Sequence, residues 1–203
     1  YYNLEIDQSG VKTSQGTVTA AGTMTVQSAA TYALAATTTT VSGVSDINGT
    51  ITMSTGTYDA NGQFDATGGN VTFTGAGTLK VGATVASTST SLGTLSTGAG
   101  TVWYDGGPVT IVTDTYYNLK MSSGNKGTAG NINVNGDLTV VNNAYDTETY
   151  TTTVTGATDI DGTLTIGTGT YDANGAFDAT SGTVTFTGAG QLNLASTITD
   201  LGT

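Results

Sequence analysis

Apolar and polar residues alternate along many short runs of this chain with a period of two. Successive side chains of a β-strand point to opposite faces, so this pattern predicts strands with one buried face and one face in water. Thr and Asn fill most of the water-facing positions of these runs. The apolar positions that define the buried faces are Ile47, Ile51, Met53, Val71, Phe73, Ile132, Val134, Leu138 and Val140.

Each alternating run begins at a glycine, as in GTVTAA, GTMTV, GTITM, GNVTF and GTLKV. The Gly, Asn and Asp residues between the runs are turn formers. Thr, Val, Ile, Tyr and Phe suit a pleated surface, whereas the strong helix formers Leu, Glu, Gln and Lys are scarce. The composition therefore predicts an all-β protein.

A long segment of the chain occurs twice. Residues 41–82 recur as residues 154–195 with about two-thirds of the positions identical. Because other short motifs recur at a similar offset, the repeat unit is about 115 residues long. We expect one continuous structure made of a first complete repeat, residues 1–115, and a second, incomplete repeat, residues 116–203.

Two architectures can use short alternating strands of this kind, an antiparallel β-sandwich array and a parallel β-solenoid whose coils stack into sheets. The solenoid is favoured by the Gly-rich corners between strands, by the single Pro, and by side chains that recur at coil-length intervals. Such recurrence places Thr on Thr and Asn on Asn in neighbouring coils. With about 22 residues per coil, we expect a parallel β-solenoid of roughly nine coils.

Both ends of the sequence already have the strand pattern. Tyr2, Leu4 and Ile6 are predicted to lie on a core face, and the final segment LNLASTITDLGT continues the repeat. Solenoids usually close their ends with a polar or helical cap, and neither end resembles one. Either the sequence is an excised fragment, or its ends pair with neighbouring copies head to tail, a contact that does not close and so generates a filament.

The charge of the chain argues against two classes of partner. It has four Lys and no Arg, and its formal net charge is -11. Nucleic-acid phosphates and anionic membrane surfaces are bound through clusters of Lys and Arg, so we expect neither partner. No apolar run approaches the length of about 20 residues that spans a bilayer, so membrane insertion is not expected either.

The residues that most catalytic sites require are missing. The chain has no His and no Cys, which removes the commonest general base, thiol nucleophiles and the usual zinc ligands. The carboxylates recur with the repeat instead of gathering at one position, so a glycosidase-like acid pair is not indicated. We therefore expect a protein that is not an enzyme and has no cofactor.

Oxygen-rich turns give one metal hypothesis. The segment TYDANG occurs at residues 57–62 and again at residues 170–175. Ca²⁺ prefers carboxylate and amide oxygens, but the spacing is neither that of an EF-hand loop nor that of the nonapeptide RTX repeat, and Asn-Gly is primarily a turn former. A structural turn is thus the competing interpretation. The calcium candidates are Asp59, Asn61, Asp65, Asp172, Asn174 and Asp178.

Two further surface features carry hypotheses about sugars. Asn48 and Asn70 each begin an Asn-X-Thr sequence, which is the acceptor pattern for N-glycosylation and is also frequent by chance in a chain rich in Asn and Thr. Trp103, close to the single proline Pro108, offers an aromatic ring on which a sugar could stack or which could simply cover the side of the solenoid. The pairs Tyr1-Tyr2 and Tyr116-Tyr117 are each predicted to be one core and one surface residue.

The order of segments in the middle of the chain carries a family resemblance. GAGTVWYDGG at residues 98–107 is followed by PVTIVTDTYYNLKM at 108–121, NINVNGDLTV at 131–140 and GTLTIGTGTYDANG at 162–175. This resembles the β-helical repeat regions of large secreted bacterial surface proteins, the filamentous-haemagglutinin-like and autotransporter-like adhesins. The resemblance implies an extracellular or cell-surface protein used in adhesion, matrix or fibre formation. Our leading interpretation is a structural protein that assembles head to tail into a filament, and the alternative is the stalk of a surface adhesin that binds glycans.

Overall fold

The chain forms a parallel β-solenoid of about nine coils. The computed structural model describes residues 1–82, 92–96 and 98–202, and these residues contain strands and turns but no helix. Two compact units divide the chain, residues 1–103 and residues 104–203. This division is one of spatial packing, and the boundary of the sequence repeat after residue 115 remains a prediction from the sequence.

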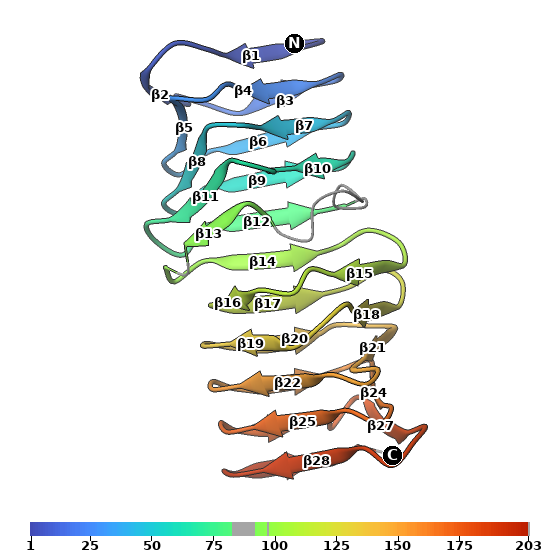
Figure 1. The fold of residues 1–203 in the computed structure, drawn as a ribbon. Coiled ribbons are helices and arrows are strands. Elements are labelled where there is room, and N and C mark those ends of the chain that lie inside the picture. Colours follow the sequence, from blue (N-terminus) through green and yellow to red (C-terminus); the bar gives the residue numbers. More distant parts are fainter. Residues whose placement is uncertain (83–91, 97, 203) are drawn as a thin grey trace. The chain divides into compact units, whose positions relative to one another are not determined.

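Three parallel sheets build the first unit, and successive strands from β1 to β12 join them in rotation (Figure 1). The first sheet is β1-β4-β7-β10, the second β2-β5-β8-β11-β13 and the third β3-β6-β9-β12-β14. The strands are β1 (Leu4–Ile6), β2 (Gly10–Thr13), β3 (Val18–Ala20), β4 (Met24–Val26), β5 (Ala30–Leu34), β6 (Thr38–Val41), β7 (Ser45–Ile47), β8 (Thr50–Met53), β9 (Thr57–Ala60), β10 (Phe64–Asp65), β11 (Asn70–Phe73), β12 (Thr78–Val81), β13 (Thr94–Ser96) and β14 (Thr101–Tyr104).

The second unit follows the same plan with its own three sets of parallel strands. These are β15-β18-β21-β24-β27, β16-β19-β22-β25-β28 and β17-β20-β23-β26-β29. The strands are β15 (Val109–Ile111), β16 (Thr115–Tyr116), β17 (Asn118–Met121), β18 (Lys126–Thr128), β19 (Ile132–Val134), β20 (Leu138–Val140), β21 (Ala144–Asp146), β22 (Thr151–Val154), β23 (Thr158–Ile160), β24 (Thr163–Ile166), β25 (Thr170–Ala173), β26 (Phe177–Asp178), β27 (Thr183–Phe186), β28 (Gln191–Leu194) and β29 (Ile198–Asp200).

The register of the strands gives the coil length directly. Leu4 pairs with Met24, Met24 with Ser45, and Ser45 with Phe64, which are offsets of 20, 21 and 19 residues. These coils are slightly shorter than the sequence spacing of about 22 residues predicts. The side chains in such a register stack directly, and the expected Thr-on-Thr ladder is present where Thr38 pairs with Thr57 and Thr57 pairs with Thr78. The paired positions of the described strands contain no Asn-on-Asn ladder.

The asparagines at the corners have a different partner from the one that the sequence suggests. Asn3 accepts a hydrogen bond from the backbone N–H of Thr23, one coil further on, at 2.9 Å. Asn118 does the same for Asp137 at 2.9 Å, and Asn131 for Thr151 at 3.0 Å. A backbone N–H at a corner lies outside the sheet and would otherwise lack an acceptor. Each Asn side chain therefore stabilises the start of the strand that lies one coil further on.

The core lies inside the coils and contains the apolar face that the alternation predicts. All nine apolar positions named from the sequence are buried, from Ile47 through Val140. Their neighbours along each strand, such as Thr52 and Thr72, point outward and remain partly exposed. The predicted sheet faces are therefore confirmed at those positions.

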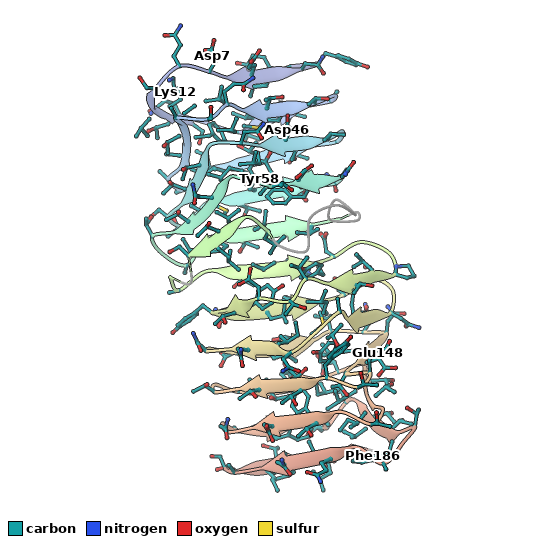
Figure 2. The ribbon with its side chains drawn as sticks, in the orientation of Figure 1. Asp7, Lys12, Asp46, Tyr58, Glu148 and Phe186 are labelled. Carbon is teal, nitrogen blue, oxygen red and sulfur yellow. The ribbon has the colours of Figure 1, made fainter. Side chains whose placement is uncertain are left out.

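Buried tyrosines cross this core and bond to hydroxyl groups of other strands. The hydroxyl of Tyr58 donates to Oγ of Ser45 at 3.0 Å, and Figure 2 shows Tyr58 between the strands of the first unit. Its counterpart in the second repeat, Tyr171, lies 3.0 Å from Oγ1 of Thr158. A buried hydroxyl without a partner is costly, so these pairs make a polar atom tolerable inside an apolar interior.

The corners between sheets require glycine where backbones of successive coils approach closely. A Cβ placed on Gly62 would meet the carbonyl oxygen of Gly43 at 2.0 Å, and a Cβ on Gly175 would meet that of Gly156 at 2.0 Å. Real Cβ atoms do not approach a carbonyl oxygen so closely, so any larger residue must displace the stack. This is the physical reason that the TYDANG turn ends in glycine.

The N-terminal residues depart from the sequence expectation, because Tyr1 is 75% exposed and neither member of the Tyr1-Tyr2 pair is a core residue. Tyr2 was predicted on the core face, but its side chain is 78% exposed, and β1 begins only at Leu4. Its ring instead lies over the corner glycine Gly22. In the second repeat, Tyr116 is buried and Tyr117 is 39% exposed, so the prediction of one core and one surface residue is confirmed for that pair. No helix in the described part of the chain is long and apolar enough to cross a membrane.

Candidate functional site

The calcium candidate Asp59 belongs to a side-chain cluster on the outer face of β9, β12 and β14. Its Oδ1 lies 3.5 Å from Nζ of Lys80, which is the next residue along the same ladder. The Lys80 Nζ in turn lies 5.0 Å from the centroid of the Trp103 ring, a cation–π contact. The carboxylate of Asp59 therefore faces a cation from the protein itself.

The other carboxylates proposed for calcium are engaged in hydrogen bonds within the protein. Asp65 accepts from the backbone N–H of Thr67 at 3.0 Å, and Asp172 accepts from the amide of Asn193 at 2.6 Å. Asp178 accepts from both Oγ1 and the backbone N–H of Thr180, and these bonds hold the pKa of Asp178 below its usual value.

The described residues contain no group of three or more acidic side chains arranged to hold a metal. The two amides, Asn61 and Asn174, are exposed at the turns, where their backbone N–H groups bond to the carbonyls of Val41 and Val154. These contacts support the structural-turn interpretation of TYDANG.

Both candidate glycosylation sites lie on the outside of the first unit. Asn48 is exposed at the turn between β7 and β8, where its amide donates to Asp46 at 2.9 Å. Asn70 is exposed on β11, with its amide 3.5 Å from Oγ1 of Thr50. Their exposure is compatible with modification, and the corresponding residues of the second repeat are Asp161 and Thr183.

Trp103, the carbohydrate candidate, is partly exposed on β14, while Val102 beside it is buried. Sugar stacking uses the face of an aromatic ring. Because Lys80 lies over the Trp103 ring, the ring already has a partner within the protein. The geometry therefore gives more support to a side-covering role than to a sugar platform.

A group of exposed apolar side chains lies on the last coil of the described chain. Phe186 is 51% exposed, Ile198 47% and Leu201 49%, and Figure 2 labels Phe186 on that coil. The equivalent of Phe186 in the first repeat is Phe73, which is only 5% exposed. There β13 pairs with β11 and covers its edge, with Val71 next to Leu95. The same side chain is thus core in one repeat and surface in the other.

The backbone edges of the end coils are also unpaired within the described chain. β1, β2 and β3 are the terminal strands of their sheets, and β27, β28 and β29 are terminal at the other end. An exposed edge strand offers a row of N–H and C=O groups to another strand. We call the surface formed by β1, β2 and β3 the N-face and the surface formed by β27, β28 and β29 the C-face.

A buried lysine in the second unit was missed by the sequence analysis. Lys126 in β18 points inward and is 1% exposed. Its Nζ lies 3.0 Å from each of five backbone carbonyl oxygens, and burial lowers the pKa of Lys126 while the charge of Asp105 acts in the opposite direction. An ammonium has three N–H donors, so the five oxygens share them. These carbonyls belong to Gly106, Gly107, Ser122, Ser123 and Gly124.

The counterpart of Lys126 in the first repeat is Lys12 in β2. Both lysines stand next to an equivalent tyrosine in register, Lys12 beside Tyr32 and Lys126 beside Tyr145. The Lys12 Nζ donates to the carbonyls of Gln8 at 2.7 Å and Ser9 at 3.0 Å, which belong to its own turn. The recurrence of lysine at an inward position was the signal in the sequence that could have identified this arrangement.

Comparison with known proteins adds no family to this picture. The chain matches no protein-family model, no curated protein and no solved structure. The fold and the end faces are therefore the basis on which function is argued.

Proposed function

We propose that this chain is a structural protein that assembles head to tail into an extracellular filament through its N-face and C-face. The observation that carries the proposal is the contrast between Phe73, covered by the next coil, and its exposed equivalent Phe186. Within the chain, a coil of the same repeat covers the side chain of Phe73. A coil of a second copy is therefore the natural cover for it on the C-face.

The chemistry of the two faces supports this association. The inward positions of the N-face include Leu4, Ile6 and Val18, and those of the C-face include Leu192 and Ile198. Burying one such side chain contributes about 1.5–3 kcal/mol, and the paired backbone edges extend the sheets. The two faces differ from each other, so the contact is heterologous and propagates into a filament.

The test blocks one face at a time in the 203-residue chain. An inward charge on an edge strand opposes strand pairing, so Ile6→Asp should block the N-face and Phe186→Asp the C-face. We expect the unaltered chain to form filaments by negative-stain microscopy and to sediment as a concentration-dependent series. Each variant alone should remain monomeric.

A mixture of the two variants gives the sharper result. Each retains one open face, and the two open faces are complementary, so the mixture should form dimers and nothing larger. Val44→Asp is the matched control, because Val44 is 38% exposed on neither face and its replacement should leave the filaments intact. Circular dichroism verifies that each variant is folded. A monomeric unaltered chain at high concentration, or dimers of either variant alone, would refute head-to-tail assembly.

The stalk of a bacterial surface adhesin is the second candidate, and the long internal repeat favours it. Residues 41–82 and 154–195 follow each other in one chain, which is how a stalk gains length. The extracellular location in both candidates rests on the resemblance of the strand and turn pattern to adhesin repeats. Binding of the chain to a glycan array, reduced by Trp103→Ala, would support the adhesin candidate.

A further inference from the structure

We infer that successive copies stack in a single rotational setting, with β1 on β27, β2 on β28 and β3 on β29. This inference rests on the head-to-tail association proposed above and specifies its geometry. Three settings are conceivable, because each face presents three strand edges. Two features of the structure select one of them.

The first feature is the spiral step at each end. In the second unit every sheet receives each third strand of the chain, as in the series β20, β23, β26 and β29. After β29, the next strand position of a continuing winding therefore lies over β27, followed by those over β28 and β29. The N-face begins with β1 and continues with β2 and β3. Placing β1 over β27 continues the winding without interruption, whereas the two rotated settings leave a strand position vacant or occupied twice.

The second feature is the environment of the inward lysine. Lys126 bonds the carbonyls of its own turn and also those of Gly106 and Gly107, in the turn that precedes β15. β15 is the strand that pairs with β18, with Val109 beside Lys126. Lys12 has only its own turn, formed by Gln8 and Ser9, among the described residues. Figure 2 shows Lys12 on the N-terminal coil.

In the proposed setting, the missing turn is supplied by the neighbouring copy. The strand under β2 is β28, and the turn that precedes β28 is the Gly-rich segment 187–190. In this setting, segment 187–190 lies beside Lys12 in the same way that the Asp105–Gly107 turn lies beside Lys126. By the same analogy, Leu192, the first inward residue of β28, corresponds to Val109 and lies beside Lys12. The outward residue Val11 then lies beside Gln191.

Cysteine cross-linking tests the setting, because the chain has no natural cysteine. Paired residues of adjacent strands lie within the Cα separation of about 4.4–6.8 Å that a disulfide needs. Val11→Cys is combined in turn with Gln191→Cys, Thr183→Cys and Asp200→Cys, which report β2 on β28, β27 and β29. On oxidation, we expect a ladder of covalent oligomers from the first pair alone.

The outcomes separate this inference from the proposed function. Cross-linking through Thr183→Cys or Asp200→Cys, or no cross-linking in chains that still form filaments, overturns the setting and leaves head-to-tail assembly standing. Chains that sediment as monomers overturn both. The dissociation constant of the contact between copies in Lys12→Met is a second measurement. A charge-assisted hydrogen bond from Lys12 to the 187–190 carbonyls strengthens this contact, so its loss should raise the dissociation constant about tenfold. An unchanged dissociation constant in Lys12→Met would remove Lys12 from the contact.

Discussion

Alkaline pH should unfold this protein abruptly because five tyrosine hydroxyls are sealed in its core. Burial raises the pKa of Tyr104 to about 12 and raises the pKa values of the other four above their usual value as well. In the unfolded chain a tyrosine ionises near pH 10. The five residues are Tyr58, Tyr104, Tyr116, Tyr145 and Tyr171.

The sign and size of the effect follow from proton linkage. Between pH 10 and the folded pKa, the unfolded chain has released a phenolic proton that the folded chain still holds, so the free energy of unfolding falls as pH rises. Each tyrosine contributes about 1.4 kcal/mol per pH unit, and five contribute about 7 kcal/mol per pH unit. For Tyr104 alone, the stability lost between pH 10 and about 12 is about 3 kcal/mol. The stability is fully present below pH 10.

The assay follows phenolate absorbance and far-ultraviolet circular dichroism together during an alkaline titration. A typical domain stability of about 5–15 kcal/mol would be exhausted within about one to two pH units above pH 10. We therefore expect a steep absorbance step that coincides with loss of the β-sheet signal. Tyr104→Phe should make the dependence of stability on pH shallower by about 1.4 kcal/mol per pH unit. Gradual ionisation of all ten tyrosines near pH 10, with the sheet signal unchanged, would refute the burial argument.

Three further substitutions or conditions test other parts of the structure. Gly62→Ala should destabilise the chain by about 1–3 kcal/mol in urea unfolding because its Cβ meets a backbone carbonyl, whereas Gly16→Ala, which meets nothing within 4 Å, should be neutral or slightly stabilising. Lys126→Met should lower the free energy of unfolding by about 3 kcal/mol, because it leaves buried carbonyls without a donor. Lys12→Met in monomeric chains should lower the free energy of unfolding by less than about 1 kcal/mol. Equal losses in the two variants would contradict the account of the buried ammonium. Calcium and a chelator should give the same melting temperature, and a calcium-dependent rise would instead support Asp59 and its equivalents as calcium ligands.

The alternation of the sequence was sufficient to predict the buried faces, because one side of every strand contacts the core. Ile51 and Val71 illustrate this, since a period of two leaves them no other face. The parallel solenoid was favoured by the Gly-rich corners, the single Pro and the recurrence of side chains at coil-length intervals. The sequence did not predict three sheets per unit, because turn residues such as Gly and Asn mark a corner without fixing its angle.

Residues that break the alternation rule were the ones that the sequence analysis missed. Lys126 occupies an inward position that the pattern reserves for apolar residues, and only the carbonyls of two turns explain it. Thr158 is similarly inward, and the hydroxyl of Tyr171 from another sheet satisfies it. Such partners come from distant strands, so their identity depends on how the sheets meet. The prediction for Tyr2 was wrong for a different reason, because no described coil covers this residue.

Unequal coil sizes have a consequence for how such a sequence can change. Thr38 pairs with Thr57 after 19 residues, whereas Thr57 pairs with Thr78 after 21 residues, yet both pairs lie in regular parallel register. The difference is absorbed at the corners, where loops lengthen at small entropic cost. Insertions and deletions should therefore accumulate between strands and not within them. Related chains would then keep the same strand order and the same alternation of buried and exposed residues, even where the number of residues per coil is no longer constant.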